Sequence, residues 1–460
     1  MKIRQLIGIL LSTLLLFACI AGCGSSAPVA LDTPAPVAAD TPAPVAADTP
    51  TPAPEKTPTP VPVETPATPE PVKTVKIGLV ATITGSNAES GRQCRLGTES
   101  AVKYVNDNGG IKALDGAKIE LITVDATSDP AQAPIAVERA LTDNPDIVAI
   151  DGCSTSSITL PMLPVIQQYK IPAICATAAN STITEQGCDY IFQPCHRGDQ
   201  SSAMQVEFMG YLAGKLGKDP SELRLAVVFE NSAWGQDVAS NNKKMCENNG
   251  LTVVAEETYP SSGLTDASSI VSKLKNANVD AILPAMYVPD TKLLLNTMAS
   301  MNYKPLIVGS GSALVWPSLV KDLGQDADGI TSTSGWCWDT TFVSANKEFV
   351  KILDDFEARE GEFMAEQTGA SFISLMMIVQ AIENGKSIEP DTIRDEISKL
   401  TAKNCPWFAL INPNSEFNEN GKNIGASPVM AQWQGGKLRA VYPEAVASSP
   451  LLNPLTLESF

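Results

Sequence analysis

The chain contains the stretch 75-VKIGLVATITG-85, in which an apolar run leads directly into a polar loop. Residues 75–80 have the length and composition of a short buried strand, and residues 93–108 follow with helical spacing up to the stop signal at Gly109-Gly110. Similar patterns alternate further along, with strands predicted at 118–124, 146–150 and 172–176 and helices at 130–144 and 157–169. This alternation predicts a parallel sheet covered by helices on both faces.

The alternation restarts after the polar segment 193–200. Strands are predicted at 224–229, 252–259, 281–285 and 306–308, and helices at 235–249, 267–276 and 291–301. We therefore expect a second α/β lobe of the same type. Later segments must complete one lobe or the other, and they are a strand at 329–334, helices at 346–359 and 372–384, and a hairpin of 429–434 and 437–442 around Gly435-Gly436.

The N-terminus is typical of a secretory signal. Lys2 and Arg4 precede an apolar run at 6–17, and the small residues of Ile20-Ala21-Gly22-Cys23 follow it. This order resembles the lipobox of bacterial lipoproteins, in which the cysteine is acylated and becomes the first residue. We therefore predict a signal peptide at 1–22 and lipidation at Cys23.

Two alternatives stay open at this terminus. Leu16-Phe17-Ala18-Cys19 is a poorer lipobox, because a bulky Phe stands where a small residue is wanted. An uncleaved membrane anchor is also conceivable, although the apolar run is marginal for a span of roughly 20 residues.

Residues 23–73 differ sharply in composition from the rest. The unit Asp32-Thr-Pro-Ala-Pro-Val-Ala-Ala39 recurs at 40–47, and further Thr-Pro and Pro-x-Pro units follow. Such a segment cannot bury a core, and its prolines favour extended conformations. We expect a stalk that separates a folded body from the membrane, with O-glycosylation as an open possibility.

The charge and the cysteines restrict the function classes. The chain has 33 basic against 51 acidic residues and a formal net charge of -18, which disfavours nucleic acid and direct docking on anionic lipid. Of ten cysteines, eight remain once Cys19 is removed with the signal and Cys23 is lipidated, and Cys188 to Cys195 is the most plausible local disulfide. His196 is the only histidine, so neither a metal nor another cofactor is expected.

Enzymatic chemistry finds little support in the sequence. There is no Gly-x-Ser-x-Gly elbow and no phosphate-binding P-loop, and a single histidine gives little scope for a Ser-His or Cys-His pair. We expect a protein that is not an enzyme.

A series of segments carries a family resemblance. The stretch from Val75 to Gly85 resembles the opening strand and cleft loop of type I periplasmic binding proteins of the branched-chain amino-acid group. Further segments are similar in the same order, namely Ala101 to Gly110, Asp125 to Ala133, Ile171-Pro172, Ala255-Glu-Glu-Thr-Tyr259 and Tyr303-x-Pro305. The resemblance implies two Rossmann-like lobes joined by three crossover segments, with a ligand cleft between them. Lobe one would comprise 74–194 plus 335–410 and lobe two 195–334 plus 411–445, followed by a tail at 446–460.

The resemblance also assigns ligand-binding positions in the first lobe. Ser156 matches the family serine that contacts the ligand's carboxylate, and Ser157 stands beside it. Ala179 occupies the position where the family has a carboxylate-binding Thr, while Thr177 lies two residues earlier. Ser90 stands where the family often has a Tyr. The alternative for Ser156 and Ser157 is a plain helix N-cap.

In the second lobe, Trp234 and Tyr287 match the two aromatic residues that close on the ligand, although both could simply serve lobe packing. Gly311 stands where receptors for branched-chain amino acids have a Glu that pairs with the ligand's ammonium. An ammonium shut in a cleft without a carboxylate would be costly. Three acids could substitute, and they are Glu89, Asp290 and Glu366.

These features predict an extracytoplasmic, lipid-anchored solute-binding protein that delivers a small ligand to the permease of an ABC importer. The ligand would be an amino acid or a related carboxylate, amide or aromatic compound. We expect a monomer. A ligand sensor that presents the solute to a signalling receptor is the alternative.

Overall fold

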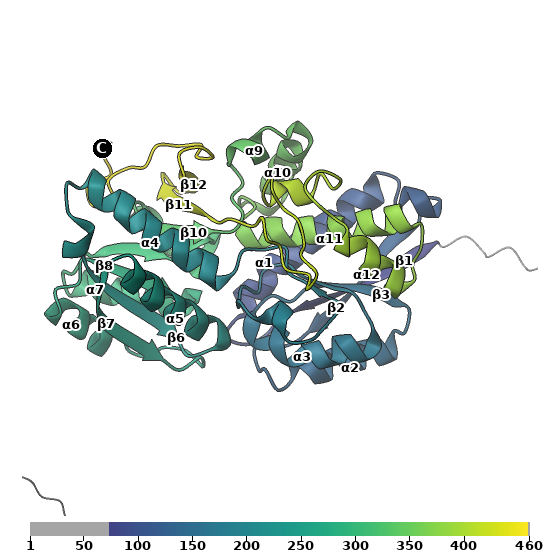
Figure 1. Ribbon diagram of the computed structural model, residues 1–460, viewed down its shortest axis with the longest axis horizontal. Helices are drawn as coiled ribbons and strands as arrows, with labels where there is room; N and C mark the ends of the chain where they lie inside the picture. Colours follow the sequence, from purple (N-terminus) through teal and green to yellow (C-terminus); the bar gives the residue numbers. More distant parts are fainter. Residues whose placement is uncertain (1–72, 459–460) are drawn as a thin grey trace, which may run out of the picture. The chain divides into compact units, whose positions relative to one another are not determined.

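The computed structural model describes residues 73–458, and the twelve strands of this part form two sheets (Figure 1). The predicted signal peptide, Cys23 and nearly all of the stalk lie outside these residues. The first sheet has the order β2-β1-β3-β4-β5, and all its pairs are parallel. Its strands are β1 (Thr74–Ala81), β2 (Lys118–Asp125), β3 (Ile147–Gly152), β4 (Ala173–Cys175) and β5 (Ile191–Phe192).

The second sheet has the order β12-β11-β10-β9-β8-β6-β7. Its strands are β6 (Arg224–Glu230), β7 (Thr252–Tyr259), β8 (Ala281–Ala285), β9 (Leu306–Gly309), β10 (Thr331–Ser334), β11 (Val429–Gln434) and β12 (Lys437–Tyr442). The strands up to β10 pair in parallel, and β11 and β12 add an antiparallel edge. Gly435 and Gly436 have φ of 58° and 78° and make the tight hairpin turn that the sequence predicts.

Helices cover both faces of the first sheet. Its strands send alternate side chains to opposite faces, so that Ile77 packs with α1 (Ala88–Asp107) and α11 (Glu366–Gly385), whereas Val80 packs with α2 (Ala133–Asp143) and α3 (Ser156–Tyr169). The helices α10 (Lys347–Glu360) and α12 (Pro390–Ser398) join the α1 and α11 side.

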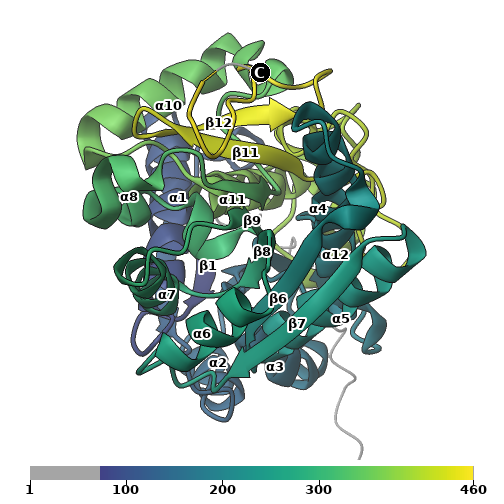
Figure 2. The same cartoon turned by 90° about the vertical axis from the view of Figure 1, so that its left-hand side faces the viewer.

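The second sheet is covered in the same way. The helix α4 (Gly198–Lys215) packs on Leu283 and Val308, whereas α6 (Ser268–Asn276) and α7 (Val288–Ser300) pack on the opposite side, around Ile282 and Ile307. Figure 2 shows α7 and α4 on either side of β8. The remaining helices are α5 (Ala233–Asn248), α8 (Pro317–Leu323) and the single turn α9 (Thr341–Ser344).

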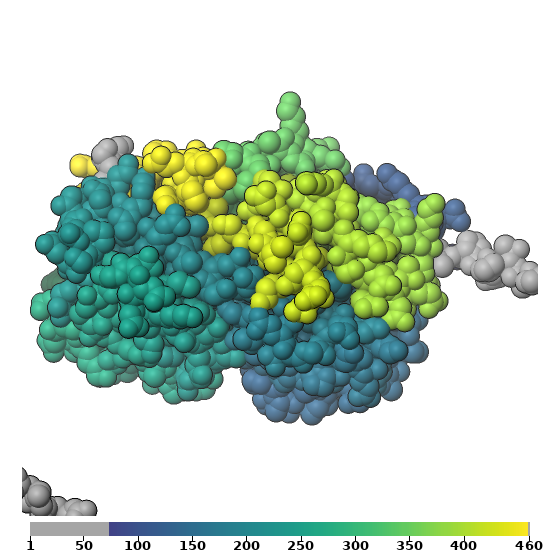
Figure 3. Space-filling view, in the orientation of Figure 1, coloured from purple at the N-terminus to yellow at the C-terminus, as the bar shows by residue number. Residues whose placement is uncertain are grey.

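The chain passes between the two sheets after β5, after β10 and after α12. The last passage carries the chain to β11, and Figure 3 shows this yellow segment at the surface, between the teal residues of the second sheet's half and the green helices of the first. The predicted α/β fold with two Rossmann-like halves is thus confirmed. Among residues 73–458, no helix is both long and apolar enough to cross a lipid bilayer.

Some sequence-based expectations were wrong. The sequence pattern predicts no helix between residues 176 and 224, but α4 occupies 198–215 and begins inside the polar segment 193–200. The helix predicted at 372–384 begins six residues earlier, at Glu366. Both helices are buried around much of their circumference, so the alternation of polar and apolar residues that marks a surface helix is weak.

The expected disulfide between Cys188 and Cys195 is not formed, and all eight cysteines of the described residues are free and buried. Cys188 packs in the apolar core beneath α3. Cys195 lies on the first passage between the sheets, and its Sγ lies 3.6 Å from the carbonyl oxygen of Ala178. The two thiols serve different parts of the structure, which spacing along the chain does not reveal.

The close packing of α1 against α11 yields a test of the fold. A Cβ on Gly97 would lie 2.0 Å from the carbonyl oxygen of Thr368 in α11. Gly97→Ala should therefore lower the free energy of unfolding by about 2 kcal/mol, because the helices must move apart. Gly210→Ala is the matched control, since a Cβ there meets nothing within 4 Å and alanine favours the helix by up to about 1 kcal/mol. Urea unfolding measures both, and equal effects would contradict the packing.

Candidate functional site

A cleft lies where loops from the carboxyl ends of strands in both sheets approach one another. The first sheet contributes the loops after β3 and β4, and the second contributes the loops after β6, β8 and β9. The N-terminus of α11 completes the wall. Residues lining the cleft are Ser154, Thr155, Ser156, Thr177, Ala178, Ala179, Trp234, Tyr287, Ser310, Gly311, Ser312, Glu366 and Gln367. Ligands of parallel α/β sheets bind at this position.

The start of α3 forms a polar wall. Thr155 is the N-cap residue in an extended conformation, so the first N–H groups of the helix have no acceptors within it. Ser156 Oγ accepts the N–H of Asn180 at 3.0 Å, which leaves the hydroxyl hydrogen of Ser156 free to donate. Gly152 allows the sharp turn into this helix, because it has φ of 120° and a Cβ there would lie 2.3 Å from Val80 O. The wall therefore offers N–H and O–H donors to a negative group.

The loop after β4 is less available as a donor. Thr177 Oγ1 donates to the carbonyl of Ser154 at 3.2 Å, so its hydrogen is already used. Ala179 offers only its backbone here, and its carbonyl accepts the N–H of Gly198, the first residue of α4, at 2.7 Å. The Ala at this position thus offers no side-chain hydroxyl to the cleft.

An aromatic pair forms the opposite wall. The rings of Trp234 and Tyr287 lie with centroids 5.2 Å apart at an angle of 45°, and both side chains are more than nine-tenths buried. Ser232 caps α5 by accepting the N–H of Trp234 at 3.3 Å. A Cβ on Gly235 would lie 2.0 Å from the carbonyl of Glu230, so only glycine fits directly after the tryptophan. The local sequence thereby fixes where the Trp234 ring points.

Beneath this pair lies the carboxylate of Glu230, which accepts hydrogen bonds from the Ser232 hydroxyl and from Gly235 N. Burial raises the pKa of Glu230 to about 7 and raises that of Tyr287 well above its usual value. Tyr287 is therefore a neutral hydrogen-bonding group at every physiological pH.

Of the three acids named as substitutes for the missing Glu at Gly311, Glu366 lines the cleft. Its Oε1 accepts the N–H of Gly335 at 2.7 Å, and Oε2 lies 3.3 Å from the position that a Cβ on Gly311 would take. His196 Nδ1 lies 3.5 Å from Oε1. Burial raises the pKa of Glu366 to about 7, while burial and the nearby Arg197 lower that of His196 to about 4.

The other two acids point elsewhere. Glu89 pairs with Arg92 at 2.8 Å, and Asp290 accepts the Tyr259 hydroxyl at 3.1 Å and Leu264 N at 2.7 Å. Neither is among the residues that line the cleft.

Six of the eight predicted ligand-binding residues line the cleft, and Ser90 and Ser157 do not. Ser90 is fully buried behind the wall, where it donates to Ser154 O and accepts from Gln367 Nε2, each at 3.2 Å. Ser157 lines a separate cavity near Ser232. Cleft-lining residues that the sequence reasoning missed include Ser154, Thr155, Ala178 and Gln367, each of which lies within two residues of one that it named.

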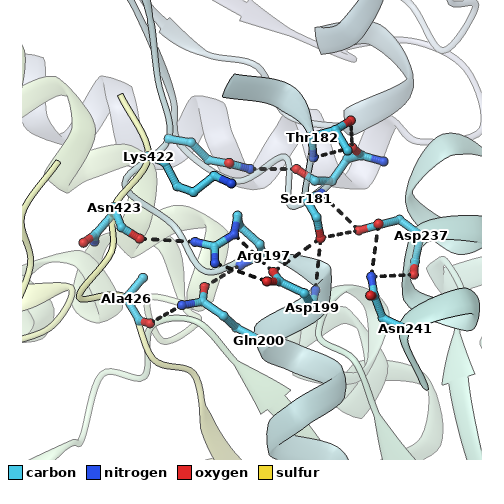
Figure 4. Close-up of polar contacts among 12 residues, drawn as sticks. Ser181, Thr182, Arg197, Asp199, Gln200, Asp237, Asn241, Lys422, Asn423 and Ala426 are labelled. Carbon is cyan, nitrogen blue, oxygen red and sulfur yellow. Dashed lines mark hydrogen bonds and ion pairs between the residues drawn. The ribbon is translucent and has the colours of Figure 1, made fainter. Parts of the chain in front are cut away.

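Polar contacts between the two halves surround the first passage (Figure 4). Ser181, from the loop after β4, donates its N–H and its hydroxyl to Asp237 of α5 at 3.1 and 2.9 Å. Arg197 donates to the carbonyl of Asn423 at 3.2 Å, which links the first and last passages between the sheets. In this arrangement the halves lie close together, and the cleft between them leaves about 30 Å³ for the centres of water molecules, which is room for a few waters.

Comparisons with known proteins agree with this architecture. A family model described as a periplasmic binding protein matches residues 74–437. Two proteins of Brucella melitensis, the Leu/Ile/Val-binding protein homologues 8 and 7, are 29% and 28% identical, covering 81% and 83% of this chain and 91% and 94% of their own. The expectation that the chain is not an enzyme is confirmed, because these relatives are binding proteins.

Solved structures share the fold at lower identity. A branched-chain amino acid transporter substrate-binding protein from Streptococcus pneumoniae, in complex with isoleucine, has a TM-score of 0.68 at 23% identity, covering 80% of this chain and 98% of its own. A solute-binding protein of an ABC transporter from Rhodopseudomonas palustris, in complex with 3,4-dihydroxybenzoic acid, has a TM-score of 0.67 at 18% identity, covering 80% and 96%. The chain therefore belongs to the periplasmic binding protein family, and among its members it resembles those of the branched-chain amino-acid group.

Proposed function

We propose that this binding protein captures a small carboxylate-bearing solute in the cleft and delivers it to the permease of an ABC importer. One observation carries the proposal. The unpaired N–H groups and the Ser156 hydroxyl at the start of α3 face a buried aromatic pair, Trp234 and Tyr287, from the other half. A donor-rich helix start suits a carboxylate, and the aromatic rings suit an apolar or flat remainder.

The ligands of two relatives support the carboxylate. Isoleucine and 3,4-dihydroxybenzoic acid, which are bound by the proteins of S. pneumoniae and R. palustris, differ in shape and polarity but share this group. The polar wall would then hold the common feature, while the rest of the cleft would select among amino acids, other organic acids, amides and aromatic compounds.

The small volume of the cleft supports a binding mechanism in which the two halves close on the ligand. The halves would separate to admit the solute, and contacts such as Ser181 to Asp237 would form again on closure. A permease can distinguish the closed form from the open one, because only closure fixes the position of one half's outer surface relative to that of the other half.

Thermal unfolding tests the binding function. The chain without its first 23 residues is melted with amino acids, amides, and aromatic and short-chain organic acids. A true ligand at a thousandfold excess over its Kd should add about 4 kcal/mol to the free energy of unfolding. Ser156→Ala should weaken that ligand by about 10-fold or more, because a hydrogen bond to a charged group is lost.

The matched control is Ser269→Ala, which alters an exposed serine of α6 and should leave the affinity unchanged. If none of the compounds raised the melting temperature, the proposed function would be wrong. If Ser156→Ala bound as tightly as the parent, the polar wall would not hold the ligand.

We further propose that Cys23 carries a lipid that anchors the protein to the outer face of the cell membrane, as its lipobox-like context suggests. Cys23→Ser should abolish incorporation of labelled palmitate and move the protein from the membrane to the soluble fraction. Cys19→Ser is the matched control and should retain both label and membrane association. The reverse result would place the lipid at Cys19.

A further inference from the structure

The cleft contains an uncompensated acid. Glu366 is the one carboxylate among its lining residues, and no Lys, Arg or His side chain lines it within the described part of the chain. Glu366 is only 8% exposed. His196, whose Nδ1 lies 3.5 Å from Oε1, is a buried imidazole that stays neutral near pH 7. A buried carboxylate without a cation is costly, so this group is expected to take a positive partner.

The geometry fixes where that partner would sit. Gly335 N holds Oε1, whereas Oε2 forms no hydrogen bond among residues 73–458 and faces Gly311. A side chain at Gly311 would be strained, because φ is 85°, and its Cβ would come within 3.3 Å of Oε2. Gly311 and Glu366 are therefore complementary, because the absence of a side chain at Gly311 leaves room for the Glu366 carboxylate.

We propose that Glu366 determines the specificity of the cleft by receiving a primary ammonium group of the ligand. The proposal rests on the proposed function and narrows it, since the ligand is then a zwitterion with a carboxylate and an ammonium, rather than a plain organic acid or an amide. The ligand's carboxylate lies at the start of α3, and its ammonium lies at the start of α11.

Further acceptors lie beside Glu366. Gln367 and Ser312 both line the cleft, and Gln367 Oε1 and Ser312 Oγ have no hydrogen-bond partner in the described residues. An ammonium group has three N–H donors. One charged oxygen and two neutral oxygens match that number. These acceptors explain why a cation, and not only a hydroxyl, suits this end of the cleft.

The same carboxylate contacts two of the three passages between the sheets. Gly335 follows β10 on the second passage, and His196 lies on the first. A Cβ on Gly335 would lie 1.8 Å from His196 Nδ1 and 2.9 Å from Glu366 Oε1, so the three groups pack without spare room. A ligand ammonium that binds Glu366 would therefore bind at the point where the two halves join.

Glu366→Gln provides the first test, because it keeps the shape and removes the charge. Calorimetry measures binding of each standard L-amino acid and of the matching carboxylic acid that lacks the amino group. The parent should bind an L-amino acid and not its deaminated partner. Glu366→Gln should weaken that amino acid by about 100-fold, since a buried charge pair loses one member. The unliganded variant should melt no lower than the parent at pH 8, because a buried carboxylate has been removed.

Glu89→Gln is the matched control, because its carboxylate lies outside the cleft and is paired with Arg92. It should change the affinity less than about 3-fold. If the deaminated acids bound the parent as well as the amino acids did, or if Glu366→Gln bound the amino acid unchanged, Glu366 would not have this role, although solute binding would stand. If no compound bound, the proposed function would fall as well.

The pH dependence of affinity provides a second test. Burial raises the pKa of Glu366 to about 7, and an ammonium at Oε2 would lower it again. The other titratable groups that face it are His196, Cys195 and Cys337, of which the imidazole has a pKa of about 4 and both thiols have pKa values raised well above the usual range, mainly by burial. None of these three changes charge between pH 5 and pH 8.

The affinity for an amino acid should therefore be highest and independent of pH around pH 8, where Glu366 is ionised. It should fall as the pH drops through about 7, because protons then compete with the ammonium for Glu366. In Glu366→Gln this loss should disappear. A ligand without an ammonium would show the opposite slope, since it avoids the ionised carboxylate. A flat profile, or the opposite slope with an amino acid, would overturn the proposal.

Discussion

Parallel pairing of the strands is the constraint from which the cleft follows. Each parallel connection must return the chain to the same edge of its sheet, so the loops after β3, β4, β6, β8 and β9 all lie at carboxyl ends of strands. The carboxyl-end edges of the two sheets face one another across the cleft. Polar side chains and helix starts from distant parts of the sequence therefore share one small volume, which no local segment could build alone.

Within that volume the chemistry is divided. Donors gather at the start of α3, aromatic rings come from the other half, and Glu366, the one carboxylate that lines the cleft among residues 73–458, stands at the start of α11. Such a division favours a ligand with distinct ends over one with a uniform surface. Burial strengthens each polar contact and also penalises each one that is left unmade. The oxygens of Gln367 and Ser312, which have no hydrogen-bond partner in the part of the chain that the structure describes, fit a site that is completed by its ligand.

The passages between the sheets connect the polar groups of the cleft to the segments that join the two halves. Arg197 ties the first passage to the last through Asn423, while Glu366 touches the second through Gly335 and the first through His196. Tight packing around Gly335 leaves little freedom at this point. Ser181 and Asp237 join the halves directly, outside the set of residues that line the cleft.

The sequence by itself determined the alternation of strands and helices, the Gly435-Gly436 hairpin and the placement of Ser156, Trp234 and Tyr287 near strand ends, because these are local patterns set by periodicity and turn residues. It named three acids in place of the one missing at Gly311 and could not choose among them. Only the tertiary structure brought Glu366 to Gly311, kept Cys188 and Cys195 apart as free thiols, and began α4 inside a polar segment. The approach of Glu366 to Gly311 joins residues far apart in the chain, and buried helices lose the polar face from which a pattern is read.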